Sequence, residues 1–318
     1  MMEATAGLDE IRIHFGEAQT ARLVGQGGLG LNLDTVHLGG PTQEVLFQCE
    51  GAEQELVGDF SFYRDQGRMA GVAVVDCPIE EVESAAQGLY HDLLLHTQGL
   101  KLQRLWNFVP RINDESLGQE VYRSFNEGRW KAFAGTYGEE NMDLKLPAAT
   151  AVGLQGECER LALVFLAGEQ EVAHFENPRQ TPAYRYPSEF GPCSPSFARG
   201  TVVSESRGRV AYLSGTSSIC GSQTVGEGDL SKQISETIEN IQVALQQMGF
   251  EGGLRERDCV AQLRVYVRDP GDYAEIRERL EAEITARLAE QVVYVQADIC
   301  REPLKLEIEG VFRAQGEA

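Results

Sequence analysis

The chain of 318 residues lacks the features that mark membrane, secreted and nucleic-acid-binding proteins. It has no apolar run near the roughly 18 residues that cross a bilayer. Its opening residues, MMEATAGLDE, are acidic where a signal peptide would be basic. Its formal charge of −21 leaves no excess of basic residues for general binding of nucleic acid. We therefore expect a cytoplasmic protein with no membrane and no nucleic-acid partner.

Metal-binding and disulfide patterns are also missing. The seven cysteines stand singly, with no CxxC pair and no histidine at zinc-ligand spacing. Their odd number favours reduced thiols, mostly buried as small hydrophobic groups. His91 and His96 differ by five positions and do not share a helical face, and no G-x-S-x-G motif occurs. We expect no metal, no cofactor and no serine hydrolase site.

One glycine-rich motif looks like a dinucleotide site but has the wrong context. Residues 25–30 read GQGGLG, which satisfies the pattern G-x-G-x-x-G. That pattern needs a helix after it, because the helix N-terminus binds the phosphate. The following LNLDTVHLGGP alternates like a strand instead. The motif is therefore not expected to bind a nucleotide.

The sequence does contain enough apolar material, 42% hydrophobic residues, for a packed core in two domains. Both halves repeat the order strand, helix, strand, helix, strand, strand. In the first half these elements are expected at 67–75, 79–96, 100–109, 119–133, 147–154 and 160–168. In the second half they are expected at 208–215, 233–248, 260–269, 272–290, 292–299 and 304–312.

We therefore predict an α+β protein of two tandem domains, 1–170 and 171–318, each a mixed sheet with two helices on one face. The segment 176–200, rich in proline and tyrosine, is the expected linker. Its aromatic residues argue against disorder, and long ordered loops are usually functional.

The last expected strand carries two acids. LKLEIE alternates, so Glu307 and Glu309 share one face. Matching the two halves places Val164 opposite Glu307 in the repeat and Leu166 opposite Glu309. A structural acid would often persist in both copies, whereas a catalytic acid is needed once. The asymmetry favours a site in the second half.

Several arginines lie among aromatic residues, and two interpretations of them stay open. In QLRVYVRD, alternation puts Arg264, Tyr266 and Arg268 on one face. That face is either solvated or a wall that binds carboxylates through guanidinium groups. In the second case Tyr184, Tyr186 and Phe197 of the linker would close a cavity between the domains.

The second half resembles the reactive-intermediate deaminase (YjgF/RidA-like) family. The segments that carry this resemblance are PSFARG, YLSGTSS, QISETIENIQVALQQMGF, RVYVRDPGDY and REPLKLEIEGVF. The whole chain, with RLWNFVPRIN, FNEGR, ENPRQTPAYRYPSEFGP and ADICREPLKLEIE, resembles the chorismatases. These are built from two such domains, of the fold also called chorismate-mutase-like, and only the second domain carries an active site.

The resemblance implies cleavage of the enolpyruvyl ether of chorismate, with release of pyruvate. Glu307 matches the family's glutamate and is the candidate general acid, because the enol ether methylene must be protonated. Glu309 is left as structural or solvent-facing. The candidate substrate-binding residues are Arg129, Arg199, Tyr184, Arg264 and Trp106, of which Arg264 is a weaker candidate than Arg129 and Arg199. Two domains in one chain also make a monomer plausible.

Gly215 and Cys300 match the form of the family that makes 3-hydroxybenzoate. A small residue at 215 would leave room for the ring to turn, and the Cys300 thiol would assist capture by the ring hydroxyl. The alternative for Cys300 is an inert buried thiol. Other products, a trans-dihydroxycyclohexadiene carboxylate or 4-hydroxybenzoate, stay open. An imine or enamine deaminase and a non-catalytic metabolite-binding protein also remain alternatives.

Overall fold

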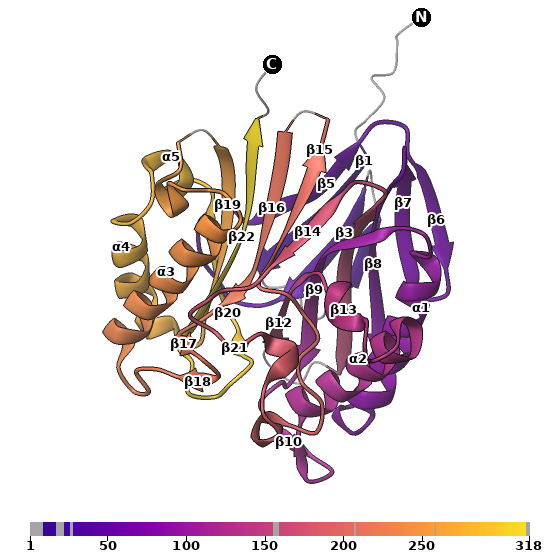
Figure 1. Ribbon diagram of the computed structural model, residues 1–318, viewed down its shortest axis with the longest axis horizontal. Helices are drawn as coiled ribbons and strands as arrows, with labels where there is room; N and C mark the ends of the chain where they lie inside the picture. Colours follow the sequence, from indigo (N-terminus) through magenta and orange to yellow (C-terminus); the bar gives the residue numbers. More distant parts are fainter. Residues whose placement is uncertain are drawn as a thin grey trace, which may run out of the picture.

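Three β-sheets face one another in the computed structural model, and the helices lie on the outer flanks (Figure 1). The structure describes residues 9–16, 22–25, 28–154, 159–206, 208–257 and 259–315. Within these ranges no helix is long and apolar enough to cross a membrane. The predicted α+β class with two repeated units is confirmed.

The first large sheet has seven strands in the order β21-β12-β9-β13-β8-β7-β6. Its strands from the first half are β6 (Glu53–Val57), β7 (Phe60–Asp65), β8 (Arg68–Asp76), β9 (Lys101–Pro110), β12 (Ala148–Leu154) and β13 (Arg160–Gly168). The helices α1 (Val82–His96) and α2 (Val121–Tyr137) cover its outer face and bury an apolar core. The short β10 (Glu115–Ser116) and β11 (Gln119–Glu120) form a hairpin before α2.

The second large sheet has the order β14-β15-β16-β22-β19-β20-β4. It contains β14 (Val172–Phe175), β15 (Gly200–Glu205), β16 (Gly208–Thr216), β19 (Cys259–Val267), β20 (Val292–Gln296) and β22 (Leu306–Gln315). The helices α3 (Leu230–Gln247), α4 (Tyr273–Glu281) and α5 (Ala286–Ala289) cover its outer face. A hairpin of β17 (Ile219–Cys220) and β18 (Gln223–Thr224) follows β16.

The two halves exchange short strands across their boundary. β4 (His37–Gly39) comes from the first half but pairs with β20, and β21 (Asp298–Ile299) comes from the second half but pairs with β12. The register also relates the halves: Val164 lies opposite Trp106 as Glu307 lies opposite Tyr266. The exchanged strands tie the two units into one body.

A third, four-stranded sheet was not expected from the sequence. It has the order β2-β3-β1-β5 and contains β1 (Asp9–Gly16), β2 (Arg22–Gly25), β3 (Leu29–Asp34) and β5 (Gln43–Cys49). Its apolar side chains share one core with the inner faces of both large sheets. The glycine-rich motif lies between β2 and β3 with a strand after it, as predicted, although Gln26 and Gly27 are outside the described residues.

Two other expectations need correction. The helix expected over 272–290 is interrupted: α4 ends at Glu281, and Thr285 caps α5 by accepting from the backbone N–H of Leu288. The strand expected from 304 begins at Leu306, because Leu304 ends a turn that starts at Arg301. Of the six cysteines described, three are buried, and Cys158 is outside the described residues.

The close packing of α1 against α2 can be tested at two glycines of α2. A Cβ at Gly128 would lie 2.0 Å from the carbonyl oxygen of Glu83 on α1, whereas a Cβ at Gly135 would meet nothing within 4 Å. We expect Gly128→Ala to lower the free energy of unfolding by about 1–3 kcal/mol, because the helices must separate. Gly135→Ala should raise it by about 0.5–1 kcal/mol through helix propensity. Thermal or urea unfolding of both variants measures this, and equal effects would contradict the close approach.

Candidate active site

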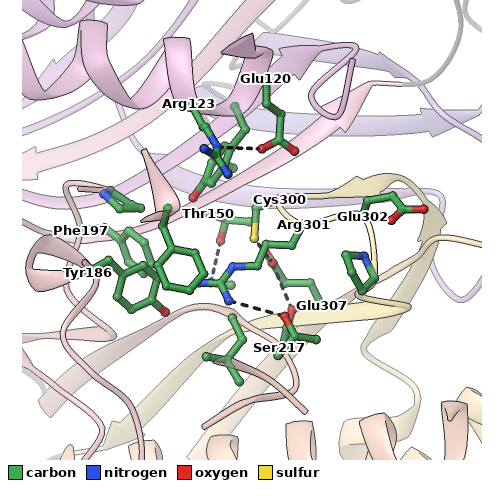
Figure 2. Close-up of a pocket in the computed structure, with 18 of the residues that line it drawn as sticks. Glu120, Arg123, Thr150, Tyr186, Phe197, Ser217, Cys300, Arg301, Glu302 and Glu307 are labelled. Carbon is green, nitrogen blue, oxygen red and sulfur yellow. Dashed lines mark hydrogen bonds and ion pairs between the residues drawn. The ribbon is translucent and has the colours of Figure 1, made fainter. Parts of the chain in front are cut away.

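A cavity of about 330 Å³ lies at the seam between the two large sheets, a size typical of small-molecule sites (Figure 2). Residues of α2, β12, the linker, β16 and the loop before β22 line it. They include Tyr122, Arg129, Ala149, Thr150, Tyr186, Phe190, Phe197, Arg199, Gly215, Ser217, Cys300, Arg301 and Glu307. Every part of the wall therefore comes from one chain.

Strand alternation in β22 turns its two glutamates inward. Leu306 and Ile308 pack into the core under the helices, and Glu307 and Glu309 point to the opposite face, toward the other sheets. Both carboxyl groups are buried, with exposed fractions of 4% and 3%. Only Glu307 lines the large cavity, whereas Glu309 lies deeper between the sheets.

A β-bulge makes room for the Glu307 carboxyl. The pairing of β16 with β22 shifts register between Leu213 and Thr216, which places Gly215 in the irregular segment. A Cβ at Gly215 would lie 2.0 Å from Oε1 of Glu307. The space beside Gly215 is thus filled by the acid. This corrects the expectation that a small residue there leaves room for a substrate ring.

Burial, and after it the negative charge of Glu309, raise the pKa of Glu307 to about 7. A hydrogen bond from Ser217 Oγ to Oε2, at 3.3 Å, and the charges of Arg104 and Arg199 oppose the rise only in part. Glu307 therefore holds its proton in a substantial fraction of molecules at neutral pH. This is the state that a general acid needs.

Cys300 contacts the same carboxyl. Its thiol donates to Oε2 of Glu307 with Sγ 3.8 Å away, and Figure 2 shows Cys300 and Ser217 on either side of that group. Burial and the Glu307 charge raise the pKa of the thiol to about 12. Arg268 fixes the loop by donating to the carbonyl oxygens of Ile299, Arg301 and Leu304. Cys300 is thus a neutral donor, neither a thiolate nucleophile nor a base.

The four buried arginines fall into two classes. Arg104 and Arg264 form ion pairs with Glu309, and Arg264 also pairs with Glu44. Arg129 and Arg199 line the cavity, and among the described residues neither forms an ion pair and each has an Nε without a hydrogen-bond partner. A buried guanidinium without a carboxylate partner is costly unless an anion binds there. The cavity is therefore suited to an anionic ligand.

Aromatic side chains from the linker form one wall of the cavity. Tyr186 accepts a hydrogen bond from Arg199 at 2.7 Å and lies under the Arg301 guanidinium, 5.1 Å from the ring centroid. Arg301 also lies 4.2 Å from the Phe190 centroid. Phe197 packs beside Arg199 on the same wall, as Figure 2 shows for Tyr186 and Phe197. These planar groups suit an unsaturated ring.

Three of the predicted binding residues lie elsewhere. Arg264 is held by Glu44 and Glu309 outside the cavity, so its face is neither solvated nor a substrate wall. Trp106 lies in the core, 4.9 Å below the Arg104 guanidinium. Tyr184 packs against the first domain, and Tyr186 takes its place in the wall.

Sequence reasoning missed several polar lining residues, among them Thr150, Ser217 and Tyr122. Thr150 and Tyr122 come from the first half, where no acid was expected, and no periodicity connects them to β22. Ser217 follows the SGT segment directly and could have been found as its neighbour. Within the described residues, no three His, Cys, Asp or Glu side chains are grouped to bind a metal ion.

Comparison with known proteins agrees with this architecture. The family model for the N-terminal part of FkbO/Hyg5-like chorismatases matches residues 44–167, and the endoribonuclease L-PSP model matches residues 197–313. A chorismatase of Streptomyces hygroscopicus is 34% identical over 238 residues, 71% of this chain and 67% of the relative. The chain belongs to the chorismatase family.

Two further relatives, one curated protein and one solved structure, are similar to this chain. A 3-hydroxybenzoate synthase of Streptomyces hygroscopicus is 37% identical over 218 residues, 65% of this chain, and the match spans 62% of that relative's length. A chorismatase crystal structure superposes with a TM-score of 0.83 at 28% identity, covering 98% of this chain and 94% of that one. The shared fold extends over both domains and the seam between them.

The contact between Cys300 and Glu307 can be tested without substrate. Because only the thiolate reacts with iodoacetamide, we expect alkylation of Cys300 at pH 8 to be far slower than that of the exposed Cys220. Glu307→Gln should speed the reaction at Cys300, because the carboxylate charge that raises the thiol pKa is gone. Peptide mass spectrometry after timed labelling measures both rates. An unchanged Cys300 rate in the variant would show that the two groups are not coupled.

Proposed function

We propose that this chorismatase cleaves the enolpyruvyl ether of chorismate to pyruvate and 3-hydroxybenzoate. The observation that carries the proposal is a buried glutamic acid with a pKa of about 7 in a cavity that also holds two arginines without carboxylate partners. A relative named 3-hydroxybenzoate synthase supports the product assignment. Gly215 and Cys300, which contact the acid, also support this assignment.

Glu307 starts the reaction as general acid. It transfers its proton to the methylene carbon of the enol ether, which leaves a carboxylate on Glu307 and an oxocarbenium-like cation on the substrate. The new carboxylate then lies next to the cation and stabilises it. Proton transfer and charge stabilisation need no metal or organic cofactor, so none is part of the proposal.

Arg129 and Arg199 hold the substrate. Chorismate carries two carboxylates, and the net charge of −21 repels such a dianion at long range. Two buried guanidinium groups without carboxylate partners overcome that repulsion locally through charge-assisted hydrogen bonds. Tyr186 and Phe197 pack on the ring. A monomer is part of the proposal, because one chain carries both halves that form the cavity.

Cys300 directs how the cation is captured. Pyruvate and 3-hydroxybenzoate together contain all the atoms of chorismate, whereas the dihydroxycyclohexadiene route consumes one water. A neutral thiol beside the acid occupies space where a water would otherwise bind, and it favours capture of the cation by the ring hydroxyl at C4. The hydroxyl oxygen bonds to the cationic carbon and gives its proton to the Glu307 carboxylate. Loss of the C3 proton and cleavage of the C4–O bond then make the ring aromatic, and the resulting hemiketal divides into pyruvate and 3-hydroxybenzoate. The diol and 4-hydroxybenzoate are the alternatives within the family.

A second candidate comes from the L-PSP match, which covers the half that carries Glu307. An imine or enamine deaminase of the RidA type would use the same acid on amino-acid-derived substrates. The two arginines in the cavity and the linker aromatics favour the cyclic dianion. Two assays distinguish the candidates. Release of pyruvate from chorismate in the presence of EDTA supports the proposal. No pyruvate from chorismate, together with release of ammonia from an enamine, supports the second candidate.

Replacement of the acid should stop turnover. We expect Glu307→Gln to reduce pyruvate release by about 10²–10⁴-fold, because the amide cannot deliver a carboxylic proton. In the unmutated protein, kcat/KM should be level at low pH and fall as pH rises through about 7, where Glu307 of the free protein loses its proton. A lactate dehydrogenase assay over pH 5–9 measures both. Glu278→Gln, on the outer helix α4, is the matched control, and near-normal turnover of Glu307→Gln would remove this residue from the mechanism.

The product depends on Cys300 in this proposal. We expect Cys300→Ala to raise the share of the dihydroxy diene several-fold, because water gains a place beside Glu307. Chromatography with mass detection of the ring products measures the ratio. Cys220→Ala, outside the cavity, is the control. Gly215 is left unchanged, since any Cβ there displaces the acid. A constant product ratio in Cys300→Ala would show that Cys300 only packs beside Glu307 and does not direct the product.

A further inference from the structure

The second glutamate of β22 lies at the centre of a buried charge network. Glu309 accepts from four donors: Arg264 at 2.7 Å and the Tyr266 hydroxyl at 3.0 Å on Oε1, and Arg104 and the Thr150 hydroxyl on Oε2. With every lone-pair direction used and its exposed fraction at 3%, Glu309 has no capacity left to bind substrate. Its charge nevertheless acts on its neighbours.

Thr150 connects this network to the position of the acid. Its hydroxyl donates to Glu309 and accepts from Arg104 and from the backbone N–H of Gly215, which is 3.0 Å away. Gly215 is the bulge residue whose missing side chain leaves space for the Glu307 carboxyl. One hydroxyl from the first domain thus holds the bulge of the second domain against the buried carboxylate.

We infer that Glu309 and Thr150 are positioning residues for the acid: Thr150 fixes the bulge beside which the Glu307 carboxyl lies, and Glu309 places a fixed negative charge behind that carboxyl. This inference rests on the proposed role of Glu307 and deepens it. It explains why Glu309 lies on the same face as Glu307 without lining the large cavity.

The charges around Glu307 determine in which direction its protonation should change when the Glu309 charge is removed. Glu309 of its own strand favours the proton on Glu307, whereas Arg104 of β9 and Arg199 beside β15 disfavour it. Cys300 and Tyr122, which also face it, are neutral because burial raises the pKa of each. The groups Glu44, Arg264, Glu309 and Arg104 sum to zero charge. Removing the Glu309 charge alone leaves one net positive charge behind the acid.

The test is an infrared titration of the protein without substrate. The carbonyl band of the protonated carboxyl that is present in the unmutated protein and absent in Glu307→Gln reports the titration of Glu307 itself. We expect Glu309→Gln to lower its midpoint by about one pH unit, because an arginine charge is no longer balanced. The double variant Glu309→Gln with Arg104→Met restores neutrality, so its midpoint should return toward that of the unmutated protein. An unshifted midpoint in Glu309→Gln would overturn the inference.

Thr150 provides a milder test that does not unbalance a buried charge. Thr150→Val removes the hydroxyl and retains the shape, and Thr150→Ser retains the hydroxyl. We expect Thr150→Val to lower kcat about tenfold with little change in KM, because the bulge and the carboxyl beside it lose their fixed position, and Thr150→Ser to recover most of kcat. If both variants match the unmutated protein, Thr150 has no positioning role.

The two assays separate this inference from the proposed function. If chorismate gives no pyruvate but the infrared midpoint shifts as expected, the inferred effect of the Glu309 charge on Glu307 is supported and the reaction assignment is wrong. If pyruvate forms but neither the midpoint nor the alkaline limb of kcat/KM moves in Glu309→Gln, the reaction stands and the inference fails.

Discussion

The network of Glu44, Arg264, Glu309 and Arg104 is the interaction on which the arrangement of the three sheets depends. Glu44 lies on β5 of the small sheet, Arg264 and Glu309 on the second large sheet, and Arg104 on the first. All four side chains are buried. Removing one partner of such a buried pair typically costs about 3–5 kcal/mol, because the other charge is left without a counter-ion. The network therefore joins all three sheets, and separating them would leave buried charges without counter-ions.

The buried Glu307 carboxyl lowers the stability of the folded state when it is ionised. The pKa of Glu307 rises from 4.5 to about 7 on folding, so the folded state holds the proton more tightly than the unfolded state does. The resulting stabilisation is fully present below pH 4.5 and is lost as pH rises through about 7. Above that range the ionised, buried carboxylate costs on the order of 3 kcal/mol relative to an unshifted group. Sites that need a buried acid commonly carry such a cost.

Duplication explains why one chain has two similar sheets and one acid. Arg104 and Arg264 occupy corresponding positions, each opposite the residue that matches Glu309 in register, which is Leu166 in the first domain. The single carboxylate of Glu309 thus pairs with an arginine from each copy. Val164, at the position of Glu307, is buried in the apolar core, so the first half contributes part of the cavity wall but no acid at this position.

The sequence by itself determined the repeated order of elements, the strand face shared by Glu307 and Glu309, and the family of the chain, because periodicity and motifs are local in sequence. It did not reveal the third sheet, the break after α4 or the partners of Arg264. Tertiary structure alone decided which arginines line the cavity without forming an ion pair among the described residues, that Gly215 makes room for the Glu307 carboxyl, and that Thr150 reaches the bulge from the other half. Those outcomes depend on contacts between residues more than 40 positions apart, whose burial and pairing no local pattern encodes.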